Sequence, residues 1–135
     1  MQLGKENIVL ILDTHTLVWV LLGNERLGPQ QVARIEDPDM PIYISAVSGY
    51  EIANKFRTGK FPQAVSILEL AKDNFKDFDW KFLPVTLQHA RLAGGLEGNH
   101  RDPFDRILAA QSIVENMPIM TIDLEIRKLG AEVIW

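Results

Sequence analysis

Short aliphatic runs alternate along this chain with longer segments in which apolar residues recur at helical spacing. The runs that predict strands are 8–12, 42–45, 80–85, 118–121 and a short final one at 131–135. The first run is entirely aliphatic, so we expect it to be buried on both faces of a sheet. Alternation of strands and helices predicts an α/β fold with a mostly parallel sheet.

Glycine, proline and capping residues predict where the helices begin and end. The expected helices cover approximately 14–22, 29–36, 47–58, 63–78, 86–93, 103–116 and 124–129, and a loop is expected over 94–99. Pro29 and Pro103 fit the first position of a helix, where the missing N–H is not needed. Gly59 fits a left-handed position directly after a helix.

Length and composition favour one cytoplasmic domain. We expect the 135 residues to form a single domain, 1–135, with residues 1–7 as a loose N-terminal leader. The absence of cysteine excludes disulfides and thiolate metal sites, and it is compatible with a reducing cytoplasm. The longest apolar stretch, 8–22, is interrupted by polar residues and is too short to cross a membrane.

The net charge of −4 argues against non-specific binding of nucleic acid through a basic surface. It does not exclude a nuclease, because metal ions can neutralise substrate phosphates locally. Composition alone therefore leaves the partner open.

Four acidic residues far apart in the sequence are expected to meet at one edge of the sheet. We call Asp13, Glu51, Asp105 and Asp123 the acidic quartet. Three of them follow predicted strands, and the carboxyl ends of parallel strands lie at the same edge. Without cysteine or a zinc-like histidine pattern, clustered carboxylates indicate a Mg²⁺ or Mn²⁺ site. Hydrolysis of phosphodiesters is the first function that such a site suggests.

Each acid taken alone also has a structural explanation. Asp13 and Asp123 fit N-caps, and Glu51 fits a solvated helix position. In the segment Asp102-Pro103-Phe104-Asp105 the first acid fits an N-cap and the last fits the first helical turn. If Asp102 caps this helix, Asp105 is the better metal ligand and Asp102 an auxiliary acid. The joint arrangement of the quartet, rather than any single acid, indicates a site.

Other polar residues near the acids are candidates for supporting roles. The hydroxyls of Thr14 and Thr121 could orient a ligand or water, or simply cap helices. Lys55, Arg101 and Arg106 could grip phosphates, and salt bridges to acids on a solvated face are the alternative. Neither His15 nor His100 has the spacing of a zinc site, and His100 is at most a substrate contact.

The chain resembles PIN-domain proteins, and among them VapC-type toxins of bacterial toxin–antitoxin pairs. The resemblance rests on LDTHTLVW, ISAVSGYEIANKFRTGKF, HRDPFDRILAAQ and MTID, in this order over about residues 8–135. It implies a three-layer α/β/α fold, Mg²⁺- or Mn²⁺-dependent endoribonuclease activity, a homodimer, and inhibition by a protein antitoxin. Gly49-Tyr50 departs from the bulkier apolar-Trp pair that related sequences often carry.

The resemblance also implies roles for the acidic quartet. Asp13 and Asp105 are expected to bind the metal directly, and Glu51 and Asp123 directly or through water. The mechanism expected is hydrolysis of RNA with water as nucleophile.

Other functions are compatible with parts of the sequence. An aspartyl-phosphate phosphatase would have D-x-D-x-T after the first strand, but His15 stands in place of the second Asp. A receiver domain would need paired acids there. A non-catalytic PIN-like module that binds protein partners is the remaining alternative, although a degenerate pocket would normally have lost some of the quartet.

Overall fold

Five parallel strands form the centre of the protein. The computed structural model describes residues 9–23, 25–60 and 80–135, so the expected leader 1–7 and the expected helix 63–78 lie outside the described residues. The strands are β1 (Leu10–Leu12), β2 (Ile42–Ser45), β3 (Trp80–Leu83), β4 (Ile119–Met120) and β5 (Val133–Ile134). Their order in the sheet is β3-β2-β1-β4-β5, with β1 in the middle.

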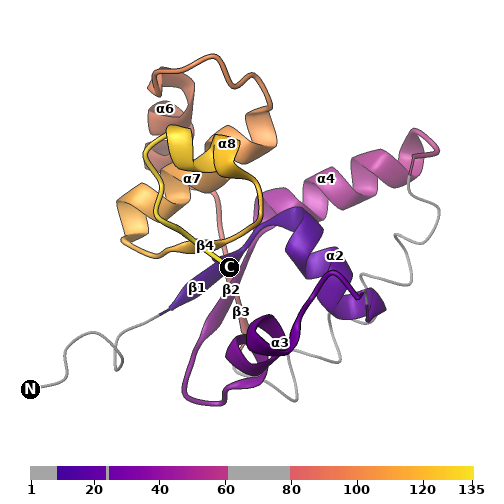
Figure 1. The fold of residues 1–135 in the computed structure, drawn as a ribbon. Helices are drawn as coiled ribbons and strands as arrows, with labels where there is room; N and C mark the ends of the chain where they lie inside the picture. Colours follow the sequence, from indigo (N-terminus) through magenta and orange to yellow (C-terminus); the bar gives the residue numbers. More distant parts are fainter. Residues whose placement is uncertain (1–8, 24, 61–79) are drawn as a thin grey trace, which may run out of the picture.

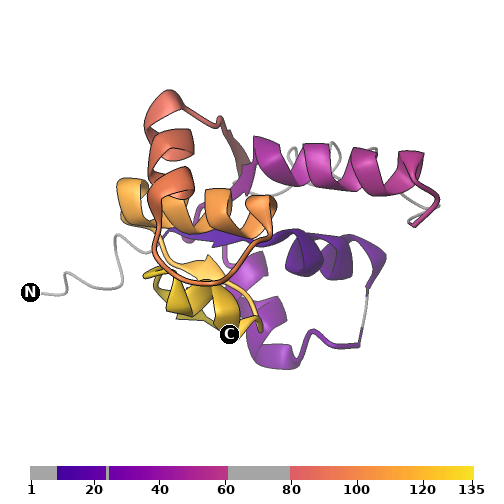
Figure 2. The same cartoon turned by 90° about the horizontal axis from the view of Figure 1, so that it is seen from above.

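Helices cover both faces of this sheet, as Figures 1 and 2 show. They are α2 (Thr14–Leu22), α3 (Pro29–Glu36), α4 (Ala46–Arg57), α6 (Leu87–Gly95), α7 (Pro103–Glu115) and α8 (Leu124–Lys128). Helices α2 and α3 pack on one face, and α7 and α8 pack on the other. The three-layer α/β/α fold expected from the sequence is confirmed, and every described strand pairing is parallel.

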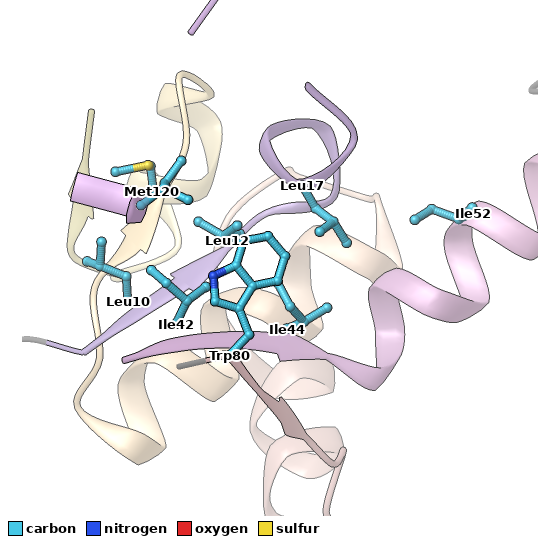
Figure 3. Close-up of a cluster of buried hydrophobic side chains, with 9 residues drawn as sticks. Leu10, Leu12, Leu17, Ile42, Ile44, Ile52, Trp80 and Met120 are labelled. Atoms are coloured by element: carbon cyan, nitrogen blue, oxygen red, sulfur yellow. The ribbon is translucent and has the colours of Figure 1, made fainter. Parts of the chain in front are cut away.

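Alternation along β1 supplies both halves of the core. Leu10 and Leu12 face the side of α2 and α3, whereas Ile11 faces the side of α7 and α8, as the period of a strand requires. All three residues are fully buried. Figure 3 shows Leu10 and Leu12 gathered with Trp80 of β3 and Leu17 of α2.

Most element boundaries agree with the sequence-based expectations to within a few residues. The strands are shorter than expected, and β3 ends at Leu83 because Pro84 has no N–H for the ladder. Asn116 ends α7 in a left-handed conformation, with φ of 55°. Gly59, which was expected to be left-handed, has φ of 76°.

The expected loop over 94–99 begins two residues later than predicted. Gly94 and Gly95 belong to α6, so that boundary was wrong. The Arg106 guanidinium donates to the carbonyls of Ala93 and Leu96 and so satisfies this helix end from a distant segment. Local sequence does not reveal such a long-range cap.

Among the described residues, no helix is both long and apolar enough to cross a membrane.

Replacing Leu12 by alanine should lower the free energy of unfolding by about 2–5 kcal/mol, because it leaves a cavity between the central strand and its neighbours. Urea unfolding measures this difference. Leu87→Ala is the matched control, since Leu87 is 76% exposed and its truncation should change stability by no more than about 0.5 kcal/mol. Equal losses in the two variants would contradict the central position of β1.

Candidate functional site

Strand register brings the first acids together. Leu12 at the end of β1 pairs with Met120 at the end of β4, so the residues that follow, Asp13 and Thr121, leave the sheet side by side. Leu12 also pairs with Ile44 of β2, just before α4 begins. The C-terminal edge of the sheet therefore collects the starts of α2, α4 and α8.

Asp13 lies at the centre of this edge and is only 4% exposed. Its Oδ1 accepts a hydrogen bond of 2.8 Å from the backbone N–H of Thr16 and caps α2. Its Oδ2 accepts a hydrogen bond of 2.5 Å from the hydroxyl of Thr121. The N-cap expected as a structural explanation is thus present, and it fixes the carboxylate in one orientation.

Thr121 connects two acids of the quartet. Its hydroxyl donates to Asp13 and accepts from the backbone N–H of Asp123 at 3.0 Å. The Asp123 side chain caps α8 by accepting from the backbone N–H of Glu125 at 2.9 Å. Thr121 therefore holds the two acids in a fixed relation.

Glu51 is buried on the inner side of α4 and only 4% exposed, in contrast to a solvated helix position. The Lys55 ammonium lies 2.8 Å from Glu51 Oε2, one helical turn away, and neutralises its charge. The hydroxyls of Thr14 and Ser48 are 2.9 Å apart and join α2 to α4. Ser48 and Glu51 are three residues apart and share a face of α4.

Asp105 lies in the first turn of α7, next to an unexpected partner. His100 Nε2 is 2.8 Å from Asp105 Oδ2, and both side chains are about one-fifth exposed. Burial raises the pKa of Asp105 to about 6, the His100 hydrogen bond opposes this rise, and the charges of Asp102 and Asp123 add to it. Crowded carboxylates of this kind gain from a bound cation.

Asp102 and the two arginines have distinct local roles. The Asp102 side chain caps α7 by accepting from the backbone N–H of Phe104 at 2.9 Å, as expected from the sequence. The guanidinium of Arg106 donates to the carbonyls of Ala93, Leu96 and His100. Arg101 is exposed. Of the two arginines, Arg106 is the one engaged with the protein backbone.

His100, expected from the sequence to be at most a substrate contact, lies beside two acids of the quartet. Donor atoms of His100, Asp105 and Asp123 all lie within 4.8 Å of one another, which is a spacing that a metal ion can bridge. One imidazole and two carboxylates form a donor set that fits a divalent cation. Of the acidic quartet, this group contains Asp105 and Asp123 but neither Asp13 nor Glu51. The only signal in the sequence was the position of His100 just before the DPFD segment.

Comparison with known proteins identifies the fold family. Residues 10–132 match the family model of the PIN domain. The chain belongs to the PIN-domain family. Its resemblance to PIN domains, first suggested by four sequence motifs, is thereby confirmed. PIN domains are generally nucleases and typically use divalent metals.

Solved structures with the same fold include chains of toxin–antitoxin complexes. VapBC2 from Rickettsia felis, bound to a promoter DNA fragment, matches with a TM-score of 0.67 and 14% identity over 94% of this chain and 98% of that chain. DNA-bound VapBC from Salmonella typhimurium has a TM-score of 0.68 and 15% identity over 94% and 97%.

VapBC-5 from Mycobacterium tuberculosis, a member of the VapBC family of toxin-antitoxin systems, has a TM-score of 0.61 and 22% identity over 93% of this chain and 95% of that chain. At these identities the matches show a shared fold. No curated protein sequence matches this PIN domain.

The raised pKa of Asp105 predicts a stability that depends on pH. In the absence of metal the folded PIN domain keeps this proton up to about pH 6, whereas an unfolded carboxyl loses it near 3.8. The carboxylate therefore costs stability increasingly as pH rises from about 4 to about 6, and the full cost is present above pH 6. Relative to wild type, Asp105→Asn should gain roughly 1–3 kcal/mol on going from pH 4 to pH 7.5.

Urea unfolding in EDTA at the two pH values measures this change. Asp39→Asn, the same replacement at an exposed acid, is the control and should show no such gain. A difference between Asp105→Asn and wild type that is the same at both pH values would contradict the raised pKa.

The hydrogen bonds of Arg106 predict that this arginine is structural. Arg106→Ala should destabilise the PIN domain by about 2–4 kcal/mol, because it removes the charged donor from three backbone carbonyls. The exposed Arg101 supplies the control, and Arg101→Ala should stay within about 0.5 kcal/mol of wild type. Thermal unfolding of both variants separates the roles, and equal stability would contradict this assignment.

Proposed function

We propose that this PIN domain is a metal-dependent endoribonuclease and the toxin component of a toxin–antitoxin pair. The observation that carries this proposal is the group of donor atoms from His100, Asp105 and Asp123, which lie within 4.8 Å of one another. The hydroxyl of Thr121 links the buried carboxylate of Asp13 to the backbone of Asp123 beside this group. Carboxylates held this close to one another are stabilised by a bound cation. Their arrangement therefore supports a metal-binding function.

In the proposed metal site the acids of the quartet have two kinds of role. Asp13 and Asp105 bind Mg²⁺ or Mn²⁺ directly, and Glu51 and Asp123 bind it directly or through water. When bound, such an ion lowers the pKa of water and stabilises negative charge on a leaving oxygen. Thr121 keeps the Asp13 carboxylate in position through its 2.5 Å hydrogen bond.

The protonation of Asp105 and the pairing of Glu51 with Lys55 in the free protein are compatible with binding of a cation. Asp105, with a pKa of about 6, gives up its proton readily near neutral pH as positive charge approaches. Lys55 compensates Glu51 in the free protein and is one-third exposed. Once Glu51 faces a cation instead, the ammonium of Lys55 is available to a substrate phosphate.

We propose Lys55 and Arg101 as phosphate contacts of the RNA. Arg106, also a candidate from the sequence, keeps its guanidinium on three carbonyls and contributes through the position of its loop. Thr14 and Asp102 act as supports, Thr14 through its contact with Ser48 and Asp102 as the cap of α7.

Water is the proposed nucleophile, so the RNA 2′-hydroxyl takes no part in cleavage. Attack by water at phosphorus leaves a 5′-phosphate and a 3′-hydroxyl. This distinguishes the proposed reaction from cleavage by the neighbouring hydroxyl, which forms a 2′,3′-cyclic phosphate.

The toxin assignment, the antitoxin partner and a homodimer belong to the same proposal. The support is the fold shared with VapBC chains. Large apolar side chains on the surface, such as Leu87, Leu124 and Tyr50, are compatible with contacts to other proteins. The cytoplasmic location expected from the sequence stays a prediction.

The purified protein should cut a total-RNA pool in the presence of Mg²⁺ or Mn²⁺ and should lose this activity in EDTA. Asp13→Asn should reduce cleavage by at least about 100-fold, because the change removes a charged ligand from the centre of the site. Gel analysis and end-labelling of the products measure both the activity and the chemistry of the ends.

Asp39→Asn, made and purified in the same way, is the matched control and should cut like wild type. Identical bands from wild type and Asp13→Asn would indicate a contaminating nuclease, and cyclic phosphate ends would contradict attack by water. If the pool stays intact in every lane, the non-catalytic binding module becomes the better description.

A further inference from the structure

His100 occupies a position that the proposed nuclease chemistry has not yet used. It lies on the loop between α6 and α7, and its Nε2 is 2.8 Å from Asp105 Oδ2. A carboxylate oxygen of Asp123, at the start of α8, completes a group of three donor atoms within 4.8 Å of one another. Three separate segments thus direct an imidazole and two carboxylates to one point.

The spacing of these donors suits a single divalent ion. Opposite ligands of an ion bound at about 2.1 Å are about 4.2 Å apart, so the three donors need only a small contraction to share it. A pocket of about 480 Å³ adjoins His100 and is open to solvent. It is lined by Gly98, Asn99, His100, Glu125, Lys128 and Leu129. The pocket thus reaches His100, one of the three donors.

The loop that carries His100 is held in place by the protein. Arg106 Nη1 donates to the carbonyl of His100 itself at 2.9 Å, and the rest of the guanidinium binds the carbonyls of Ala93 and Leu96. This clamp connects the loop to α7, the helix that carries Asp105. Ligands held in this way keep their geometry before the metal arrives.

We propose that His100 is a nitrogen ligand of the divalent cation in this PIN domain and that it makes the site prefer Mn²⁺ to Mg²⁺. This inference rests on the metal dependence of the proposed function and adds a ligand outside the acidic quartet. Mg²⁺ strongly favours oxygen donors and retains its waters, whereas imidazole is a good ligand for transition-metal dications. A neutral nitrogen in the coordination sphere therefore favours Mn²⁺.

Pulsed electron paramagnetic resonance of the Mn²⁺-loaded protein tests the ligand without any measurement of activity. Wild type should show the ¹⁴N modulation of a directly bound imidazole, and His100→Ala should lose it. The affinity for Mn²⁺, from titration calorimetry, should fall at least roughly tenfold in this variant. The affinity for Mg²⁺, from competition with Mn²⁺, should fall less.

His15→Ala is the matched control, because His15 is an exposed imidazole two residues from Asp13. It should keep both the ¹⁴N modulation and the Mn²⁺ affinity. The remaining histidine, His89, is buried and paired with Glu115 at 2.7 Å. A nitrogen signal that disappears with His100 alone therefore identifies the ligand.

Two results would overturn the inference, and they differ in what else they affect. Mn²⁺ bound to wild type without ¹⁴N modulation, yet lost in Asp13→Asn, would remove His100 from the coordination sphere and leave the proposed nuclease intact. Failure of wild type to bind Mn²⁺ at all would overturn both the role of His100 and the metal-dependent function.

Discussion

The hydrogen bond between the Thr121 hydroxyl and the Asp13 carboxylate joins segments that are 108 residues apart in the chain. It exists because β1 and β4 are parallel neighbours that end at the same level. The same junction is tied by a second hydroxyl, since Thr16 donates to the carbonyl of Met120 at 3.1 Å. Asp123 is tied to this junction directly, because its backbone N–H donates to the hydroxyl of Thr121.

The buried and crowded acids at this edge lower the stability of the fold, and they are the groups that the proposed function uses. Burial, with a smaller contribution from the neighbouring charges of Asp102 and Asp123, raises the pKa of Asp105 to about 6. The buried carboxylate of Glu51 is paired with the ammonium of Lys55. A fold selected for stability alone would replace such groups with apolar or neutral residues. The proposed cation would replace repulsion among these carboxylates with attraction to a shared positive charge.

In the loop before α7, a residue that stabilises the fold also positions a candidate functional residue. Arg106 satisfies carbonyls at the end of α6 and in the loop, and in doing so it holds His100 beside Asp105. An arginine that resembles a phosphate contact in the sequence is therefore part of the scaffold. The imidazole that it positions lies with the carboxylates of Asp105 and Asp123 in one group of donor atoms.

The local sequence predicted most of the helices and strands that the structure describes, and it identified the acids that are candidates for the site. Aliphatic runs specified the strands because a buried parallel strand needs apolar side chains on both faces, and Pro103 and Asp102 specified the start of α7 through capping. The Glu51–Lys55 pair lies within one helix, so its i,i+4 spacing is visible in the sequence. Tertiary structure alone decided which side chains from distant segments meet. The burial of Glu51 and the hydrogen bond between Asp13 and Thr121 depend on strand order and helix packing. Local sequence patterns do not reveal them, because they join segments that are far apart in the chain.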